Sequence, residues 1–178
     1  MTFYGAQAQC CNKSCLKNIP KKDDLKPLRF QDGNWRLRHG VMRYMCLPGQ
    51  LELKIQKIAE KCGCGAELWP DRDKYDVKIT LPDGQVWAID AKTHRNPYML
   101  KKSIEKDYVF THTKAQKVFY VVPDDCLTDY PDYCKICNDA LASNFPDSIA
   151  KCVSMRIFSK ELKGEVEDVK LRNYQKKS

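Results

Sequence analysis

The sequence contains no hydrophobic run that approaches the roughly 18 residues needed to cross a membrane, so no membrane partner is expected. Its first residues, MTFYGAQAQC, lack the basic segment and the apolar stretch of a secretory signal. No low-complexity tract favours disorder, and no internal repeat is visible. We therefore expect a soluble protein of the cytoplasm.

Aromatic side chains rarely stand between the basic ones, so a stacking platform for single-stranded nucleic acid is not predicted. Basic residues are nevertheless in excess, with a formal net charge of +8 at pH 7, and a positive surface attracts polyanions. A solvated surface explains this excess as well as nucleic-acid binding does. The first quarter of the chain is rich in basic residues: Lys13, Lys17, Lys21, Lys22, Lys26, Arg29, Arg36, Arg38 and Arg43.

The 178 residues, 43% of them hydrophobic, suit one globular domain with a small appendage. We expect a basic, cysteine-containing arm over residues 1–48, an α/β core over 49–160 and a charged tail or helix over 161–178. Apolar spacing predicts helix, strand, strand, strand, helix, strand, helix and strand in the core. The predicted ranges are 51–62, 66–69, a hairpin within 75–92, 98–109, 117–122, 133–144 and 152–158. This order indicates a mixed sheet in which an antiparallel hairpin leads into a crossover helix.

The segment 75–92, YDVKITLPDGQVWAIDAK, has the pattern of a hairpin whose two strands join through Pro-Asp-Gly. That sequence predicts a three-residue loop in which the glycine takes the left-handed conformation. One register keeps the apolar residues together on one face, because it pairs Val77 with Ile89 and Ile79 with Trp87. A slip of one residue would mix core residues with charged ones, so the apolar pattern selects this register.

The same register places Asp76 directly opposite Asp90, with Lys92 on the same side of the hairpin. Opposed Cβ atoms lie roughly 4.5–5.5 Å apart, and two carboxylates at that distance repel each other. A divalent cation, Mg²⁺ or Mn²⁺, would relieve the repulsion and keep positions for water and phosphate oxygens. Lys92 would then orient or deprotonate an attacking water, or stabilise charge on the phosphate. Because D-x-K alone is common by chance, the prediction depends on the opposed pair together with the basic helix that follows.

These residues resemble the motif of the PD-(D/E)xK nuclease superfamily, which has the restriction-endonuclease-like fold. The motif residues are Asp76 and then Asp90-Ala91-Lys92, and the element order over 51–122 is also similar to the common core of that superfamily. The resemblance implies metal-dependent cleavage of nucleic acid, in which both aspartates and the backbone oxygen of Ala91 hold the metal and Lys92 is catalytic.

The superfamily often adds a metal-binding glutamate from the first core helix, and Glu52 is the matching candidate. A carboxylate at a helix N-terminus is equally well explained by the helix dipole. A literal Pro-Asp pair occurs earlier, at Asp71, and Asp73 is also near. We prefer Asp76 for the first motif position because only it opposes Asp90.

More narrowly, the segments LPGQLEL, LWPDRDKYDVKI and WAIDAK are similar to restriction-like proteins encoded beside bacterial PIWI-type defence modules. This resemblance implies a DNA-cutting subunit that works with other subunits of a defence complex. The candidate nucleic-acid contacts are His94, Arg95, Lys101 and Lys102. A surface turn before Pro97 accounts equally well for His94 and Arg95.

Ten cysteines in a chain without a signal peptide favour metal ligands or small core residues over disulfides. Cys134 and Cys137 form a C-x-x-C pair, half of a zinc site, and Cys11 with Cys15 would complete it and staple the arm to the core. An iron–sulfur cluster held by four cysteines is the less favoured alternative. The pattern of small buried residues fits Cys46, Cys126 and Cys152.

We therefore predict a Mg²⁺-dependent endonuclease that acts on DNA rather than RNA. One alternative is a catalytically silent nucleic-acid-binding or scaffolding module with the same fold. Another is a zinc-stapled interaction domain in which the charges of the hairpin are incidental. Cleavage that EDTA abolishes would separate the enzyme from both alternatives.

Overall fold

The computed structural model describes residues 48–70, 74–111 and 113–175, and the chain divides into two units between Leu47 and Pro48. The predicted N-terminal arm, including Cys11 and Cys15, lies outside the described residues apart from Pro48. No helix in the described ranges is long and apolar enough to cross a membrane.

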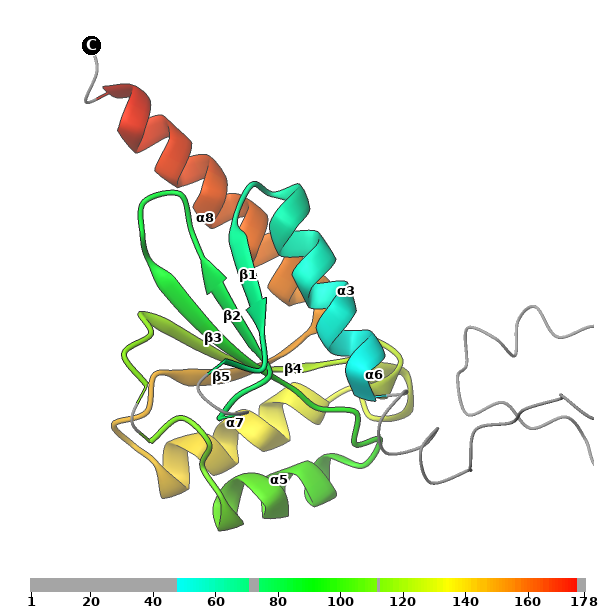
Figure 1. The fold of residues 1–178 in the computed structure, drawn as a ribbon. Helices are drawn as coiled ribbons and strands as arrows, with labels where there is room; N and C mark the ends of the chain where they lie inside the picture. Colours follow the sequence, from blue (N-terminus) through cyan, green and yellow to red (C-terminus); the bar gives the residue numbers. More distant parts are fainter. Residues whose placement is uncertain (1–47, 71–73, 112, 176–178) are drawn as a thin grey trace, which may run out of the picture. The chain divides into compact units, whose positions relative to one another are not determined.

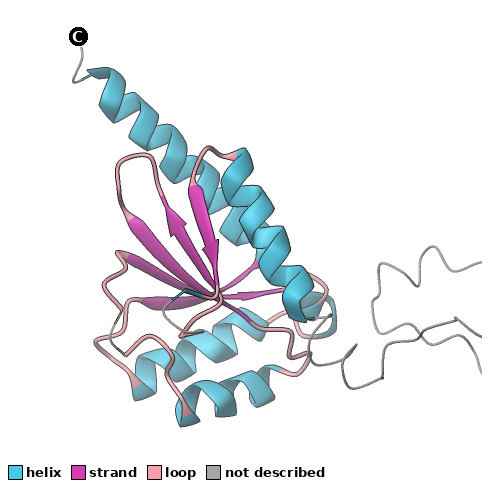
Figure 2. Cartoon of the chain, in the orientation of Figure 1, coloured by secondary structure: helices cyan, strands magenta, loops and turns pink. Residues whose placement is uncertain are grey.

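The described residues form a five-stranded sheet in the order β1-β2-β3-β4-β5, with helices on both faces (Figures 1 and 2). β1, β2 and β3 pair antiparallel, whereas β3, β4 and β5 pair parallel. This mixed sheet confirms the predicted α/β class. In chain order the elements are α3 (Pro48–Lys61), β1 (Gly65–Leu68), β2 (Val77–Thr80), β3 (Val86–Ala91), α5 (Pro97–Lys106), β4 (Lys117–Val122), α6 (Cys126–Asp129), α7 (Tyr133–Asn144), β5 (Ala150–Ser154) and α8 (Met155–Gln175).

Each face of the sheet has its own hydrophobic core. On one face, α3 and α8 pack against alternate residues of the strands, among them Val77, Trp87 and Phe119. On the other face, α5 and α7 cover a second cluster that includes Ala88 and Tyr120. In Figure 1, α3 and α8 accordingly lie on the opposite side of the sheet from α5 and α7. β4 supplies side chains to both cores and is almost wholly buried, as its continuous apolar sequence predicts.

The hairpin of β2 and β3 has the predicted register. Val77 pairs with Ile89 and Ile79 with Trp87, and all four side chains are fully buried. Gly84 has a φ of 87° and donates its backbone N–H to the Leu81 carbonyl at 2.9 Å. The glycine therefore supplies the left-handed residue that closes the turn.

The crossover helix α5 begins where its sequence predicts. Asn96 caps it, because its Oδ1 accepts a hydrogen bond from the Tyr98 N–H at 2.9 Å, and Pro97 occupies the first turn. Leu100 and Ile104 are buried against the sheet. The helix ends at Lys106, three residues before the predicted end.

The C-terminal part of the chain differs from the prediction. The strand predicted over 152–158 is wrong beyond Ser154, because α8 begins at Met155 and continues to Gln175. Phe158, Leu162 and Val166 are spaced four residues apart, so they lie on one side of the helix, and that side is buried in the core. Core packing therefore extends beyond the expected boundary at residue 160. The short helix α6 was not predicted.

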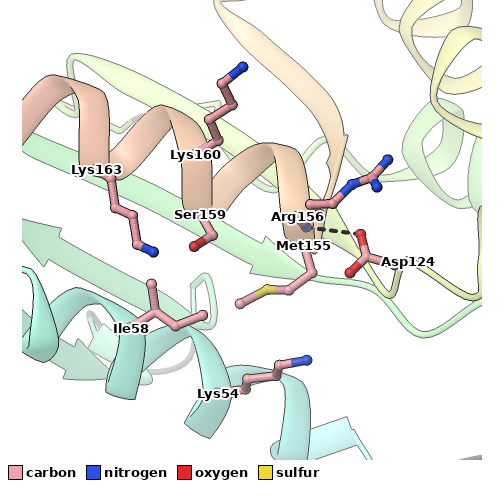
Figure 3. Close-up of a pocket in the computed structure, with 8 residues that line it drawn as sticks. All are labelled: Lys54, Ile58, Asp124, Met155, Arg156, Ser159, Lys160 and Lys163. Carbon is pink, nitrogen blue, oxygen red and sulfur yellow. Dashed lines mark hydrogen bonds between the residues drawn. The ribbon is translucent and has the colours of Figure 1, made fainter.

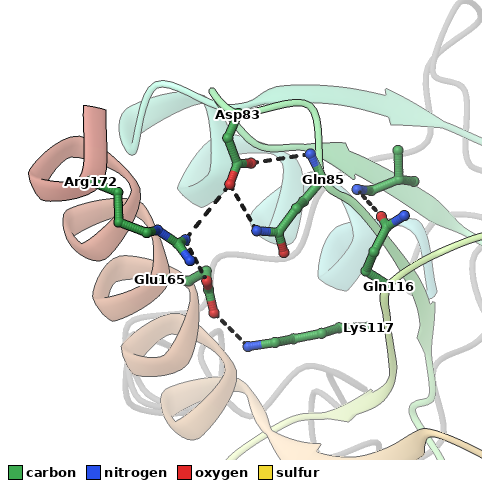
Figure 4. Close-up of polar contacts among 7 residues, drawn as sticks. Asp83, Gln85, Gln116, Lys117, Glu165 and Arg172 are labelled. Carbon is green, nitrogen blue, oxygen red and sulfur yellow. Dashed lines mark hydrogen bonds and ion pairs between the residues drawn. The ribbon is translucent and has the colours of Figure 1, made fainter. Parts of the chain in front are cut away.

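A chain of polar contacts joins α8 to the turn of the hairpin and to the start of β4 (Figure 4). Lys117 Nζ lies 2.7 Å from Glu165 Oε2, and Arg172 contacts both Glu165 at 3.2 Å and Asp83 at 3.7 Å. The hydrogen bond from Lys117 holds the pKa of Glu165 below its usual value. Because these groups are partly exposed, each ion pair adds little to the free energy of unfolding. Together the pairs join α8 to the turn of the hairpin and to β4.

Replacing Gly84 with alanine tests the turn. Gly84→Ala should lower the free energy of unfolding by about 1 kcal/mol, because alanine disfavours a positive φ. Gly164→Ala is the matched control: it lies within α8 with open space around it, and should stabilise by about 0.5–1 kcal/mol through helix propensity. Urea unfolding measures both, and equal effects of the two changes would contradict the proposed turn.

Candidate active site

Asp76 stands at the open end of the hairpin, one residue before β2. Its N–H donates to the Ile89 carbonyl at 3.1 Å, and its Oδ2 accepts a hydrogen bond from the Ala91 N–H at 2.6 Å. These two bonds hold the carboxylate of Asp76 across the hairpin, beside Asp90 in the next strand. The structure thus brings together the two carboxylates that the register predicts.

Asp90 is 3% exposed, although it carries a carboxylate. Lys92 Nζ lies 2.7 Å from its Oδ2 as an ion pair, while no hydrogen bond of good geometry from the described residues reaches this oxygen. The Lys92 N–H donates to the Val121 carbonyl at 2.8 Å, which extends the pairing of β3 with β4. Tyr120 is the β4 partner of Asp90, and burial followed by the charge of Asp90 raises the pKa of this tyrosine.

The surroundings of Asp76 change its titration. Burial, the charge of Asp90 and a hydrogen bond with Asp90 raise the pKa of Asp76 to about 7, although the Ala91 N–H and Lys92 act in the opposite direction. Burial and the neighbouring carboxylate thus both disfavour a negative charge on Asp76. A bound divalent cation would remove that penalty.

Glu52 lies in the first turns of α3 and is 6% exposed. The indole N–H of Trp69 donates to Glu52 Oε2 at 2.7 Å, and the Trp69 backbone N–H donates to the Asp76 carbonyl at 2.8 Å. Trp69 has a φ of 50°, which is unusual for a residue other than glycine. Trp69 therefore links the glutamate of α3 to the aspartate of the hairpin. Asp71 and Asp73 lie outside the described residues.

The described residues contain no group of three or more His, Cys, Asp or Glu side chains arranged to hold a metal ion. The structure thus pairs Asp76 with Asp90 but does not gather Glu52 into one three-ligand set with them. Mg²⁺ is commonly held by one or two carboxylates, with water and phosphate oxygens as its other ligands. The two aspartates fit that requirement, since they are adjacent, with Asp76 half-buried and Asp90 buried. When both are ionised, the single charge of Lys92 does not balance their two negative charges.

The predicted nucleic-acid contacts lie in the loop that follows β3 and in α5. His94 and Arg95 have exposed side chains, and the His94 carbonyl accepts a hydrogen bond from Tyr133 Oη at 2.6 Å. Partial desolvation of the ring and then the charge of Lys92 lower the pKa of His94. On α5, Lys101 lies 3.8 Å from Glu105, and Lys102 is exposed.

The two described cysteines of the predicted zinc site lie on α7, where Cys134 is half-buried and Cys137 is buried. The Cys137 thiol donates to the Pro97 carbonyl at 3.9 Å. Hydrogen bonds with Cys134 and Cys137, and then burial, raise the pKa of Cys152 on β5. Cys126 and Cys152 are buried, as predicted. The zinc staple stays a prediction, because Cys11 and Cys15 lie outside the described residues.

Sequence reasoning missed Trp69 as a member of this site. The tryptophan is 53% exposed and carries no ionisable group, and its contact with Glu52 places it in the site. The one sequence feature that points to it is its place directly before Pro70, where the chain leaves β1 for the motif aspartate.

A mixed five-stranded sheet with helices on both faces, and an Asp…Asp-x-Lys hairpin at the end of its central strands, defines the restriction-endonuclease-like class. Residues 49–169 match the family described as "REase associating with pPIWI_RE", and the chain belongs to that family. No curated protein and no solved structure matches the chain significantly.

The raised pKa of Asp76 predicts how stability depends on pH. The folded-state value, about 7, is above the ordinary value of 3.8, so Asp76 favours the folded state most at low pH, and this contribution is lost as the pH rises through 7. Asp76→Asn removes the titration. With EDTA present, the free energy of unfolding of the variant minus that of the wild type should grow by about 1–2 kcal/mol from about pH 5 to about pH 8, after allowing for solvent screening. A difference that stays constant across this range would contradict the crowding of the carboxyl groups.

The Trp69–Glu52 hydrogen bond is tested by a double-mutant cycle. Trp69→Phe keeps an aromatic ring but removes the donor, and Glu52→Gln removes the charge of the acceptor. We expect a coupling energy of about 1–2 kcal/mol in urea unfolding, because the bond joins a largely buried carboxylate to an N–H donor. Strictly additive effects of the two substitutions would show that the contact does not hold Glu52 in place.

Proposed function

We propose that this chain is a metal-dependent nuclease that hydrolyses phosphodiester bonds of DNA. The observation that carries the proposal is the meeting of Asp76, Asp90 and Lys92 at the open end of one hairpin. Membership of a restriction-endonuclease-like family supports the nuclease class.

In this proposal Asp76 and Asp90 hold Mg²⁺ or Mn²⁺, with the Ala91 carbonyl and Glu52 as further candidate ligands. The bound ion supplies positive charge that neutralises the phosphate and activates water. The Ala91 N–H fixes one oxygen of Asp76, which leaves its other oxygen available. Trp69 orients Glu52 from the side of α3.

Lys92 is the proposed catalytic lysine. Its ammonium group lies beside Asp90, and its backbone is held by β4, so its side chain extends from a rigid strand. From there it orients the attacking water or stabilises the negative charge that develops on the phosphate. The water oxygen forms a bond to phosphorus, the bond from phosphorus to the leaving oxygen breaks, and the leaving oxygen takes up a proton.

The partners of the reaction follow from the family and from the surface. The family description names association with pPIWI_RE, and we propose that this chain supplies the DNA-cutting subunit of such a defence complex. His94, Arg95, Lys101 and Lys102 remain candidate contacts to the DNA backbone.

Substitution of the motif residues tests the proposal. Asp90→Ala and Lys92→Ala should each reduce Mg²⁺-dependent cleavage of plasmid DNA by at least about 100-fold, the size of effect that a positioned catalytic group produces. Lys78→Ala is a matched control, because Lys78 belongs to the same hairpin and its ion pair within the described part of the chain is with Glu67, on a partly exposed surface. The control should cleave at the wild-type rate, and EDTA should stop cleavage by every active variant.

Two outcomes would contradict the proposal. One is wild-type cleavage by an Asp90→Ala protein whose thermal unfolding shows that it is folded. The other is binding of DNA without cleavage by the wild-type chain under any supply of Mg²⁺ or Mn²⁺, with its family partner present, which would favour the catalytically silent alternative.

A further inference from the structure

A basic pocket of about 440 Å³ lies between α3 and the beginning of α8 (Figure 3). Ile58 from α3 and Met155 from α8 supply apolar lining, and Lys163 extends from α8 toward Ile58. The basic residues that line it are Lys54, Arg156, Lys160 and Lys163, and the acidic residue among the lining side chains is Asp124.

The basic side chains that line this pocket outnumber its acidic ones by four to one. The acidic residue, Asp124, accepts at its Oδ1 a hydrogen bond from the Arg156 backbone N–H at 2.9 Å and caps α8. Among the described residues, no ion pair involves any of the four basic side chains of the pocket. By contrast, Lys117 at the start of β4 and Arg172 in the last turn of α8 are both paired with Glu165. Four cations against one carboxylate leave a net positive charge around the hollow, which favours the binding of an anion.

The pocket lies at the same end of the sheet as the candidate site. β3, β4 and β5 run parallel, so their C-terminal ends meet at one edge. At this edge β3 ends beside Asp90 and Lys92, β4 leads into Asp124, and β5 leads into Met155 of the pocket. Lys54 follows Glu52 by two residues in α3.

We infer that the pocket between α3 and α8 binds backbone phosphates of the nucleic-acid strand that reaches the candidate site. This inference rests on the proposed function and adds to it a second, non-catalytic contact with the substrate. Lysine and arginine side chains around a partly apolar hollow suit a phosphodiester backbone, because they contact the phosphates while the apolar floor accommodates sugars. Such contacts position the strand without reading its sequence, so they raise affinity for all DNA sequences alike.

The test uses the full chain in an Asp90→Ala background with EDTA, so that binding is measured without cleavage. Lys54→Ala/Lys163→Ala removes one cation from each wall of the pocket. The matched control, Lys135→Ala/Lys151→Ala, removes two exposed lysines from α7 and β5, neither of which lines the pocket. The probe is a short fluorescein-labelled DNA duplex, followed by anisotropy over a range of salt concentrations.

We expect the pocket variant to bind the duplex about tenfold more weakly, with a log–log salt slope smaller by roughly 1–2, since each lost phosphate contact lowers the slope by about 0.9. The control should change affinity by less than about twofold. Equal affinity and slope for the pocket variant and its parent would overturn the inference. A second result would also overturn it: inorganic phosphate raises the thermal stability of the protein through the pocket, but the pocket variant binds DNA as well as its parent does. The pocket would then bind a free anion and not the DNA backbone.

The failure of this inference is distinguishable from the failure of the proposed function. If the pocket variant, with Asp90 restored, cleaves DNA and binds it like the wild type, the inference fails and the nuclease assignment stands. If the pocket lysines govern DNA binding but the wild-type chain never cleaves with Mg²⁺, the inference stands and the nuclease assignment fails.

Discussion

The pairing of β2 with β3 determines where the candidate site of this protein lies. Val77, Ile79, Trp87 and Ile89 are fully buried on one side of the hairpin, and each contributes about 1.5–3 kcal/mol by leaving water. Because side chains alternate along a strand, that burial forces the carboxylate before β2 against the carboxylate in β3. The apolar core thus opposes the repulsion between two acidic groups that would otherwise separate. Burial, and then the charge of Asp90, raise the pKa of Asp76.

The two ends of the hairpin have different surroundings. At the turn, Asp83 contacts Arg172 of α8, which in turn contacts Glu165 of the same helix. The turn therefore lies against α8. At the open end, the ends of the parallel strands converge, and the charged side chains there are only partly compensated. The turn and the open end of the hairpin are at opposite ends of its strands. The sheet can therefore be stable while a carboxylate pair, a lysine and a basic pocket lie at the open end.

Much of the fold could be predicted from the sequence, because the decisive patterns are local. The hairpin register follows from the alternation of apolar residues, and KVFYVV is a buried strand because both of its faces are apolar. The strand predicted over 152–158 is wrong beyond Ser154, because these seven residues fit a strand and a helix about equally. Only the longer spacing through Leu162, Val166 and Val169 favours the helix, and Phe158 begins that apolar side.

The remaining parts of the candidate site depend on contacts between distant segments. Trp69 reaches Glu52 across 17 residues of sequence through a backbone conformation that no local pattern specifies. The basic pocket likewise combines α3 with α8, and its cations become a group only once both helices pack on the same face of the sheet. If Asp76 and Asp90 hold a divalent cation, a crystal structure with Mn²⁺ should show an anomalous-diffraction peak that contacts both carboxylates. A saturating Mn²⁺ soak that gives a peak elsewhere, or none at this pair, would contradict this assignment.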